Sequence, residues 1–488
     1  MTRKTAWAFS AGLLLMLTAG CLDDGASDPT AAPVQPVAPV VSVASIVGAA
    51  DLMTFRQSVV SPAQGIAADL YEPTMEVSDT GAIYVAAHVI GAATTGTPAY
   101  VSTDDGASWR QLPFMGPVAF PSPVQGAQPP PGDEGFIVAG DGGDVWMADI
   151  YAAGFSVTGW CDDGATQCYD NRQAYDRIAS TSEMCADGAS PEASTAASLN
   201  DRPWAAYAPG VGRLLLVNNP GGGPMQLGVM DVPPATPVGS ADPVTGPEWN
   251  LCASPDGWIP GVPAMRGDGF FAVPQRTGSG DAMRMTVVLG NVDDLFAVEA
   301  KDVFHFTSGY GGTSNGGRTA FDGDGTLFVG AYNNTDADSL EDIEGRFILA
   351  ASTDDGQRFV NVTFETTSPV RSLYLDSNLK GPGALLTWSQ LGSTNATDAE
   401  GQVSYTRSDW YVAHLAVGPR GEPVLSNVVL AVDEGPHSSA HVMGASLGPD
   451  GRAYFVNFQD DTAYPHQYVL TTPLSVWIQQ DGPTLPVA

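Results

Sequence analysis

Arginine is the residue type whose placement in this sequence most indicates chemistry. Arg202, Arg318 and Arg371 each lie 7 to 12 residues before a glycine that is expected to form a tight turn. A guanidinium group holds a planar carboxylate through two parallel hydrogen bonds, so three such arginines could bind an acidic ligand. The alternative is structural, with each arginine paired to an acidic side chain of a neighbouring sheet. The candidate ligand-binding set, extended by the same interval and by adjacency, is Arg202, Arg318, Arg371, Asp201, Glu72 and His441.

The elements that must position these residues are short strands separated by tight turns. The turn glycines recur with steps of 62, 69, 57, 56, 58 and 68 residues. A repeated group of short strands is typical of the β-propeller, in which four-stranded sheets surround a channel. We therefore predict an all-β propeller with seven four-stranded antiparallel blades. Six blades plus an irregular segment, or two unrelated β-sandwiches, are the alternatives. The turn glycines are Gly81, Gly143, Gly212, Gly269, Gly325, Gly383 and Gly451.

The two ends of the repeat region are expected to meet in one blade. A propeller commonly completes its last sheet with strands from both ends of the chain, because this removes an exposed sheet edge. The segment 54–60 alternates in the manner of a strand, and two C-terminal segments, 468–472 and 475–479, can take it as a neighbour. We expect that pairing to close the ring.

Two eight-residue segments share the pattern Ser-x-Asp-x-Gly-x-x-aromatic, and each follows an apolar strand. The residues that define them are Ser102, Asp104, Gly106 and Trp109 in the first and Ser352, Asp354, Gly356 and Phe359 in the second. In such a turn the Ser and Asp side chains bond backbone amides, and glycine takes a positive φ. The pattern resembles the Asp-box, or BNR repeat, of sialidase-like β-propellers. Asp-boxes lie on the blade periphery in that superfamily, so the resemblance implies the fold and not an activity.

The resemblance also implies which residues a hydrolase of this type would use. Sialidase-type enzymes bind the substrate carboxylate with three arginines and attack with a tyrosine that a glutamate activates. Arg202, Arg318 and Arg371 match the arginines in kind, and the phenol could come from Tyr374, Tyr405 or Tyr454. Where the family's first arginine is expected, this chain has Glu72.

The function that we expect is binding of a glycan or a protein at one face of the ring. The first alternative is an exo-sialidase-type glycoside hydrolase that uses the arginine cluster, so whether the protein is an enzyme stays open. The second alternative is an assembly or adhesion scaffold without catalysis.

The N-terminal segment reads as an export and anchoring signal. Arg3 and Lys4 precede a short apolar run, and small residues then lead to Cys21. That run is shorter than the roughly 20 residues that span a bilayer. The arrangement resembles the prokaryotic lipoprotein signal, so we expect a signal peptide at 1–20, a lipidated Cys21 with an Ala/Pro-rich linker at 21–50, and the propeller at 51–488. This predicts an exported protein that is lipid-anchored on the outer side of the membrane or at the cell surface.

The charge of the chain limits its partners. With 20 basic and 54 acidic residues, the formal net charge is −34. Such a surface repels the phosphates of nucleic acids and disfavours docking on anionic lipid. We therefore expect no nucleic acid partner, membrane attachment only through the N-terminal lipid, and a monomer.

Four cysteines besides Cys21 are expected to form two disulfides, which exported proteins tolerate. Three pairings exist, and Cys161–Cys168 with Cys185–Cys252 is preferred because the first closes a short loop. No cofactor or metal site is expected. Two alternatives stay open: a metal between His437 and His441, and Ca²⁺ in Asp-rich turns. The turns concerned contain Asp322, Asp324, Asp336 and Asp338.

Overall fold

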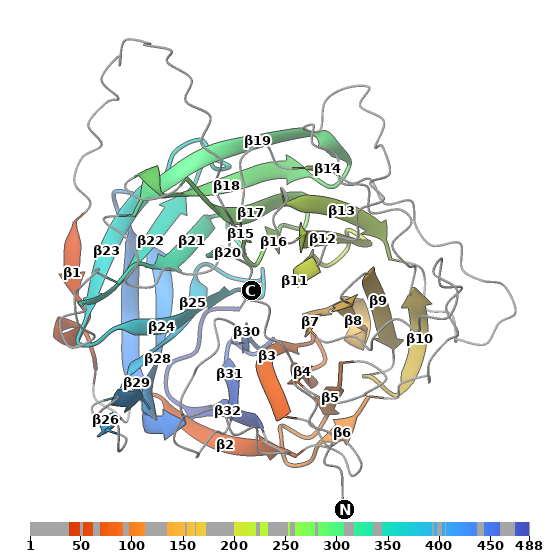
Figure 1. Cartoon of the computed structure of the whole chain (residues 1–488), viewed down its shortest axis with the longest axis horizontal. Coiled ribbons are helices and arrows are strands. Elements are labelled where there is room, and N and C mark those ends of the chain that lie inside the picture. The colour runs from red at the N-terminus through yellow and green to blue at the C-terminus, as the bar shows by residue number, and fades with distance from the viewer. Residues whose placement is uncertain are drawn as a thin grey trace, which may run out of the picture. The chain divides into compact units, whose positions relative to one another are not determined.

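The computed structural model consists almost entirely of β-strands, arranged as seven sheets of four or five strands and one two-stranded sheet (Figure 1). It describes residues 39–48, 52–61, 69–90, 97–112, 134–151, 154–161, 163–171, 200–220, 225–232, 252–253, 259–278, 282–306, 317–334, 344–392, 395–397, 403–405, 407–436, 444–458 and 474–487. All of these belong to one unit, residues 38–488. Within the described part of the chain, no helix is long and apolar enough to cross a membrane.

Each large sheet is one blade, and the blades follow the chain. Blade 1 contains β3 (Asp69–Val77), β4 (Ile83–Ile90), β5 (Ala99–Ser102) and β6 (Arg110–Gln111). Blade 2 contains β7 (Glu134–Ala139), β8 (Val145–Tyr151), β9 (Gly154–Cys161) and β10 (Thr166–Asn171). Blade 3 contains β11 (Asn200–Tyr207), β12 (Arg213–Pro220), β13 (Gln226–Asp231) and β14 (Cys252–Ala253).

In blade 4, β15 (Ile259–Pro260) and β16 (Ala264–Met265) both pair with β17 (Phe270–Thr277), and β18 (Arg284–Asn291) and β19 (Asp294–His305) follow. Blade 5 contains β20 (Arg318–Phe321), β21 (Leu327–Tyr332), β22 (Gly345–Ser352), β23 (Val360–Thr366) and the N-terminal β1 (Val40–Ser42).

Blade 6 contains β24 (Val370–Asp376), β25 (Ala384–Leu391), β28 (Arg407–Val417) and β29 (Pro423–Pro436), with the separate pair β26 (Asn395–Thr397) and β27 (Val403–Tyr405). Blade 7 contains β30 (Gly444–Leu447), β31 (Ala453–Phe458), β32 (Leu474–Asp481) and the N-terminal β2 (Thr54–Val60). Pairing within the blades is antiparallel except for β1 on β23.

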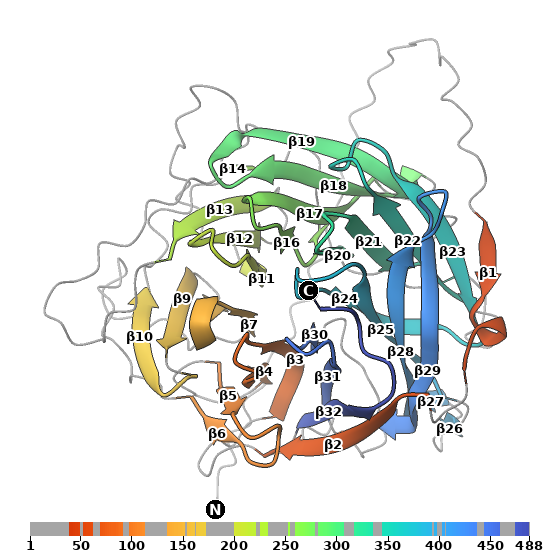
Figure 2. The ribbon, with the colours of Figure 1, turned by 180° about the vertical axis from the view of Figure 1, so that it is seen from behind.

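The first strands of the blades contact one another in a closed circle. The order β3, β7, β11, β16, β20, β24, β30 returns to β3, so each blade touches the next around a common axis (Figures 1 and 2). The prediction of a seven-bladed, all-β propeller is confirmed, and the six-bladed alternative is not needed. The large buried side chains pack between and within the sheets, among them Trp160, Trp204, Trp388 and Trp410.

Ring closure occurs in blade 7. Strand β2 pairs antiparallel with β32, with Val60 opposite Leu474 and Phe55 opposite Gln479. The predicted partnership of residues 54–60 with residues 475–479 is therefore confirmed. The fourth strand of this blade comes from the N-terminal part of the chain and the other three from the C-terminal part, so neither end leaves β32 with an unpaired edge.

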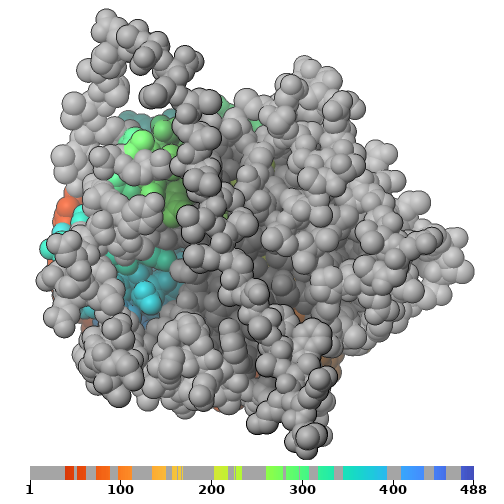
Figure 3. All heavy atoms as spheres, viewed as in Figure 1, coloured from red at the N-terminus to blue at the C-terminus, as the bar shows by residue number. Residues whose placement is uncertain are grey.

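The segment before β2 continues the contact with the ring. Strand β1 pairs in parallel with β23 of blade 5, and Val47 forms a bridge with Val428 of β29 in blade 6. Figure 3 shows β1 in red beside the described residues of blade 5. Val43 between these contacts is 3% exposed. Residues 39–48, which belong to the expected 21–50 linker, thus lie on the outer strands of blades 5 and 6.

The two Ser-x-Asp-Asp-Gly turns, residues 102–109 and 352–359, have the same internal hydrogen bonds. The amide of Gly106 donates to Ser102 Oγ (2.8 Å) and the amide of Ser108 to Asp104 Oδ1 (2.8 Å). In the second turn the corresponding distances, to Ser352 and Asp354, are both 2.9 Å. Hydrogen bonds from Ser108 lower the pKa of the Asp104 carboxyl to about 2.

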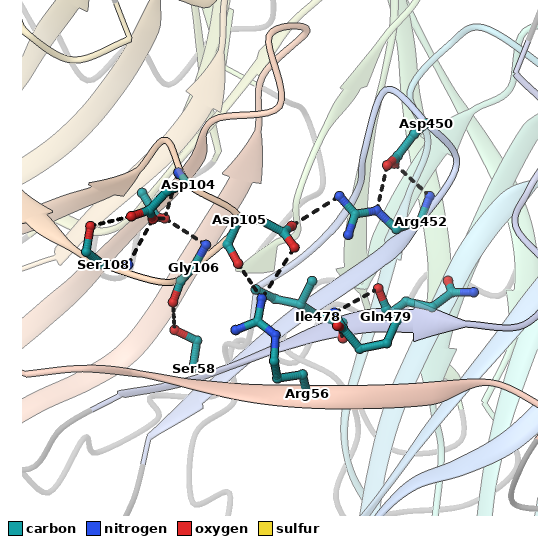
Figure 4. A network of polar contacts seen from close by, with 12 residues as sticks. Arg56, Ser58, Asp104, Asp105, Gly106, Ser108, Asp450, Arg452, Ile478 and Gln479 are labelled. Atoms are coloured by element: carbon teal, nitrogen blue, oxygen red, sulfur yellow. Dashed lines mark hydrogen bonds and ion pairs between the residues drawn. The ribbon is translucent and has the colours of Figure 1, made fainter.

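Each of these turns also holds the preceding blade. Asp105 and Asp355 both have a φ of 56°, and the carboxylate of each pairs with an arginine of the neighbouring blade. Asp105 pairs with Arg452 (3.1 Å) and Arg56, and the Trp109 indole donates to Ser58 Oγ (2.8 Å), as Figure 4 shows for the arginines. In the second turn Asp355 pairs with an arginine of blade 4, Arg266 (2.6 Å).

Replacing Gly356 in the second of these turns tests how much the contact between the turn and blade 4 contributes to stability. Gly356 has a φ of +76°, and a Cβ there would lie 2.3 Å from Leu289 Cδ1 in blade 4. We expect Gly356→Ala to lower the free energy of unfolding by about 2–4 kcal/mol through backbone strain plus overpacking. The matched control is Gly81→Ala, where φ is +85° and nothing lies within 4 Å, so that only the backbone cost of about 1–2 kcal/mol remains. Equal losses in urea unfolding would show that the contact between blades contributes nothing.

A disulfide joins Cys161 of β9 to Cys168 of β10, with a Cα–Cα distance of 5.9 Å. The bridge closes the turn at the outer edge of blade 2. Cys21 and Cys185 lie outside the described residues, as do Asp336, Asp338, His437 and His441, so lipidation, the Cys185–Cys252 pairing and the two-histidine alternative stay predictions.

Candidate functional site

An axial cavity of about 100 Å³ lies where the first strands of the blades end. Strands β3, β7, β11, β16, β20 and β24 each contribute to its wall. Most of the side chains that complete the wall are small or apolar, such as Ala205, Val262 and Phe136. The exceptions that carry chemistry are Glu76 and Asp376 with their neighbour Tyr374.

Glu76 and Asp376 form a carboxylate pair that three blades hold in place. Glu76 is the penultimate residue of β3 in blade 1, and Asp376 is the last residue of β24 in blade 6. Ser446 of blade 7 donates its hydroxyl to Glu76 Oε1 (3.1 Å) and accepts the amide of Val77 (3.0 Å). The amide of Leu447 donates to Asp376 Oδ2 (2.7 Å).

The position of this pair changes its protonation. Burial raises the pKa of the Glu76 carboxyl well above its usual range, and the negative charge of Asp376 raises it further. Burial also raises the pKa of Asp376 to about 7, although hydrogen bonds from Leu447, Ser377 and Ser446 act in the opposite direction. Two carboxylates so placed cannot both ionise easily, so the pair holds a proton near neutral pH.

Arg318 and Tyr374 lie next to the pair. Arg318 is 3% exposed, and its guanidinium carbon lies 5.4 Å from the ring centroids of both Trp204 and Tyr374. Both distances are within the range of cation–π contacts. Burial first, and then the charges of Asp376 and Glu76, raise the pKa of the Tyr374 phenol, while Arg318 acts in the opposite direction. The Tyr374 phenol therefore stays protonated in the resting protein.

A second hollow, the vestibule, has a volume of about 440 Å³. It lies among the turns that join first and second strands in blades 1, 3, 4, 5 and 6. Leu379 lines both the vestibule and the axial cavity, so the two hollows adjoin at this side chain. The residues around the vestibule are Asp79, Pro209, Arg266, Gly267, Asp268, Asp322, Gly323, Asn378, Leu379 and Lys380.

Ion pairs order the charged groups of the vestibule. Lys380 Nζ contacts Asp79 Oδ1 at 2.6 Å, which joins the β24–β25 turn of blade 6 to the β3–β4 turn of blade 1. Arg266 contacts Asp268 at 2.7 Å. All four charged side chains are at least a quarter exposed, so a ligand can reach them without breaking the fold.

The turn that carries Leu379 is fixed on both sides. Asn378 donates to the carbonyl of Gly448 in blade 7 (3.0 Å), and the amide of Gly323 in blade 5 donates to the carbonyl of Gly381 (2.8 Å). Leu379 has a φ of 58°, a conformation that is rare for a residue of this size and marks local strain. The hydrogen bonds to both neighbouring blades hold this turn where Leu379 lines the vestibule and the cavity.

The structure places the sequence-predicted site residues unequally. Arg318 begins β20 and reaches Tyr374, close to the acid pair. Arg371 is half-buried at the second position of β24. Asp201 and Arg202 lie on β11 and Glu72 on β3, but only their backbone is described, and His441 lies outside the described residues. Of the predicted set, Arg318 contacts the axial site through Tyr374.

Sequence reasoning missed the acid pair, and one signal could have found it. Glu76 and Asp376 are acidic residues that directly follow apolar residues near the ends of first strands, in Met75-Glu76-Val77 and Leu373-Tyr374-Leu375-Asp376. A carboxylate near the end of a first strand must either pair with another polar side chain or face the axis of the ring.

The described residues provide no conventional metal site. Among them, no three His, Cys, Asp or Glu side chains cluster closely enough to hold an ion. Asp322, one of the residues considered for Ca²⁺, accepts the amides of Thr326 (2.8 Å) and Gly383 (2.9 Å) and so stabilises its own turn and the next blade.

Comparisons with known proteins give similarities in structure only. No family model matches the sequence, and no curated protein matches it. Among solved structures, the phage phi92 endosialidase is 12% identical, with a TM-score of 0.45 over 88% of this chain and 70% of that one.

Two further solved structures are similar to a comparable degree. The polysaccharide lyase Uly1 is 9% identical, with a TM-score of 0.45 over 86% of this chain and 90% of that one. The α-L-arabinofuranosidase Arb93A from Fusarium graminearum is 9% identical, with a TM-score of 0.40 over 87% and 97%. Similarity this distant says nothing of what the present chain binds.

Proposed function

We propose that this protein is a carbohydrate-binding β-propeller and that the vestibule receives the glycan. The observation that carries the proposal is a hollow of about 440 Å³ on the ring axis with exposed charged side chains at its rim. This volume is within the range of roughly 300–1,000 Å³ that is typical of small-ligand sites.

The chemistry of the rim favours a hydroxyl-rich ligand. Asp79 and Asp268 accept hydrogen bonds, and Lys380 and Arg266 donate them, so vicinal hydroxyl groups find both kinds of partner. Pro209 and Leu379 add apolar surface for the C–H faces of a sugar ring. A phosphate or a polyanion would meet several aspartates at the same rim, and these oppose its binding.

Hydrolysis is the second candidate function, and one arrangement favours it. Arg318, Tyr374 and Glu76 are close together, as a sialidase-type site requires in kind. One feature weakens this candidate: the Tyr374 phenol resists deprotonation, because burial and the charges of Asp376 and Glu76 raise its pKa. A non-catalytic adhesion or assembly scaffold is the third candidate.

The proposal also includes the cellular location of the protein. We infer export through residues 1–20, lipidation of Cys21 and display of a monomeric ring at the outer side of the membrane or at the cell surface. The matching hydrogen bonds inside the turns at residues 102–109 and 352–359 support membership of the sialidase-like Asp-box superfamily. A second disulfide, Cys185–Cys252, completes the proposal.

Glycan-array binding by the mature protein tests the vestibule directly. We expect Lys380→Ala to weaken binding of the recognised glycan by about 10- to 100-fold, since a hydrogen bond to a charged group contributes roughly 1.5–3 kcal/mol. The matched control is Lys301→Ala, which removes the ion pair with Glu299 on the outer strand β19 and should leave the affinity within about twofold.

Two results would contradict the proposal. The first is the absence of any glycan ligand for the wild-type protein, and the second is equal binding by the Lys380 and Lys301 variants. Turnover of a fluorogenic sialoside that Arg318→Ala abolishes would instead establish the hydrolase candidate.

A further inference from the structure

We infer that the glycan carries a primary amino group, and that this group enters the axial cavity and binds there as an ammonium ion to Glu76, Asp376 and Tyr374. The inference rests on the proposed function for the rest of the ligand. It names the class of sugar, an amino sugar whose nitrogen is free, which the proposal above leaves open.

The number of hydrogen-bonding groups fits an ammonium ion. An –NH₃⁺ group has three donors and no acceptor. The axial cavity is lined by three residues with oxygen-bearing side chains, Glu76, Asp376 and Tyr374, and both acids are close enough to the Tyr374 phenol to raise its pKa. Ser446 is already engaged with Glu76 and with the Val77 amide, so it positions the pair.

Tyr374 provides an observation that is independent of the acid pair. Its side chain is only 4% exposed and lines the axial cavity. No hydrogen bond of its hydroxyl to another described residue is found, although its ring lies against Arg318. A phenol oxygen that lines the cavity beside two carboxylates can accept the remaining hydrogen bond of an ammonium ion.

The charge of the pair also fits. Near neutral pH the two carboxylates share a proton, which leaves one negative charge in the cavity. An entering ammonium ion replaces that proton, which leaves to solvent. The charge of the two carboxylates changes from −1 to −2, and the ligand's +1 keeps the net charge of the occupied site at −1. Among the described residues, the other charged or titratable groups at the site are Arg318, which contacts Tyr374, and Tyr207 in the cavity wall.

An organic ammonium fits better than an inorganic cation. Ca²⁺ takes about six to eight oxygen ligands, and the described residues hold no cluster of three acidic, His or Cys side chains. The cavity of about 100 Å³ admits an amino group but not a sugar ring, which would stay in the vestibule. The two hollows adjoin at Leu379, and the side chain there must yield for the amine to pass.

The test is titration calorimetry of the mature protein with chito-oligosaccharides at pH 6.5, in fully deacetylated and in N-acetylated form. We expect the deacetylated oligomer to bind at least tenfold more tightly and to release protons, seen as a difference in heat between two buffers. Glu76→Gln and Asp376→Asn should each remove the preference for the free amine. Glu299→Gln, on the outer strand β19, is the matched control and should keep it.

A second probe, methylammonium, separates this inference from the proposed function. We expect it to raise the melting temperature of the wild type at pH 8 and not that of Glu76→Gln, whether or not any glycan binds. If both oligomers bind equally and the Glu76 and Asp376 variants change nothing, the amine site is overturned and glycan binding stands. If CaCl₂ but not methylammonium stabilises the protein in a Glu76-dependent way, the inference is likewise overturned.

Discussion

Removal of residues 52–60 is expected to abolish the cooperative unfolding of the whole propeller. The deletion takes away β2, the fourth strand of blade 7, and exposes the hydrogen-bonding edge of β32 along its length. It also removes Arg56 and Ser58, which bind the Asp105–Trp109 turn of blade 1. Protein domains are stable by only about 5–15 kcal/mol, so the loss of a strand that joins two blades should leave no native ring at 37 °C.

Circular dichroism melting and calorimetry measure this outcome, with a deletion of equal length as the control. Residues 39–47 include β1, which adds a fifth strand to blade 5 without closing the ring. We expect that deletion to lower the melting temperature by several degrees and to preserve one sharp transition. A sharp, unshifted transition after removal of residues 52–60 would contradict the account of ring closure.

We expect part of the wild type's free energy of unfolding to be lost as the pH rises from about 4 to about 8. The folded state holds Glu76 and Asp376 at raised pKa values, so in this interval it binds more protons than the unfolded chain. The free energy of unfolding decreases with pH wherever the folded state binds the extra protons. This stabilising contribution is therefore fully present below the pKa values that the two carboxyls have in the unfolded chain. It is lost as the pH rises through their higher pKa values in the folded protein.

The variants isolate this component. The pKa of Asp376 moves from 3.8 to about 7, which corresponds to at most about 4 kcal/mol. We expect Glu76→Gln to be more stable than the wild type at pH 8 by roughly 1–3 kcal/mol, and the double variant with Asp376→Asn to have the flattest profile. Glu299→Gln should run parallel to the wild type in urea unfolding across this range. Parallel profiles for Glu76→Gln would show that the pair is not coupled to folding.

The turns of this fold could be predicted from the sequence because their causes are local. All seven predicted turn glycines, from Gly81 to Gly451, have a positive φ. Side chains within a few residues of the glycine bond the turn amides, as Asp322 does for Thr326. A repeat of such turns therefore reveals the blade number before any long-range contact is known.

The axial site could not be predicted in the same way because its residues meet only after the ring closes. Glu76 and Ser446 are 370 positions apart in the sequence and yet form a hydrogen bond. The spacing between Arg318 and Gly325 predicts that Arg318 lies near the start of a strand. It does not predict which side chains of other blades Arg318 contacts. Arg452 and Arg266, which were not in the predicted set, pair with acids of neighbouring blades.

The contacts of residues 39–48 with blades 5 and 6, and of residues 54–60 with blade 7, have a mechanical consequence. If the chain is pulled from its N-terminal side, the load first acts along the parallel β1–β23 pairing, then on the Val47–Val428 bridge, and only then on β2 and β32. Force therefore peels the outer strands one after another before it reaches the pairing that closes the ring. The segment therefore gives way in steps under force, and some chain length is released before the ring itself opens.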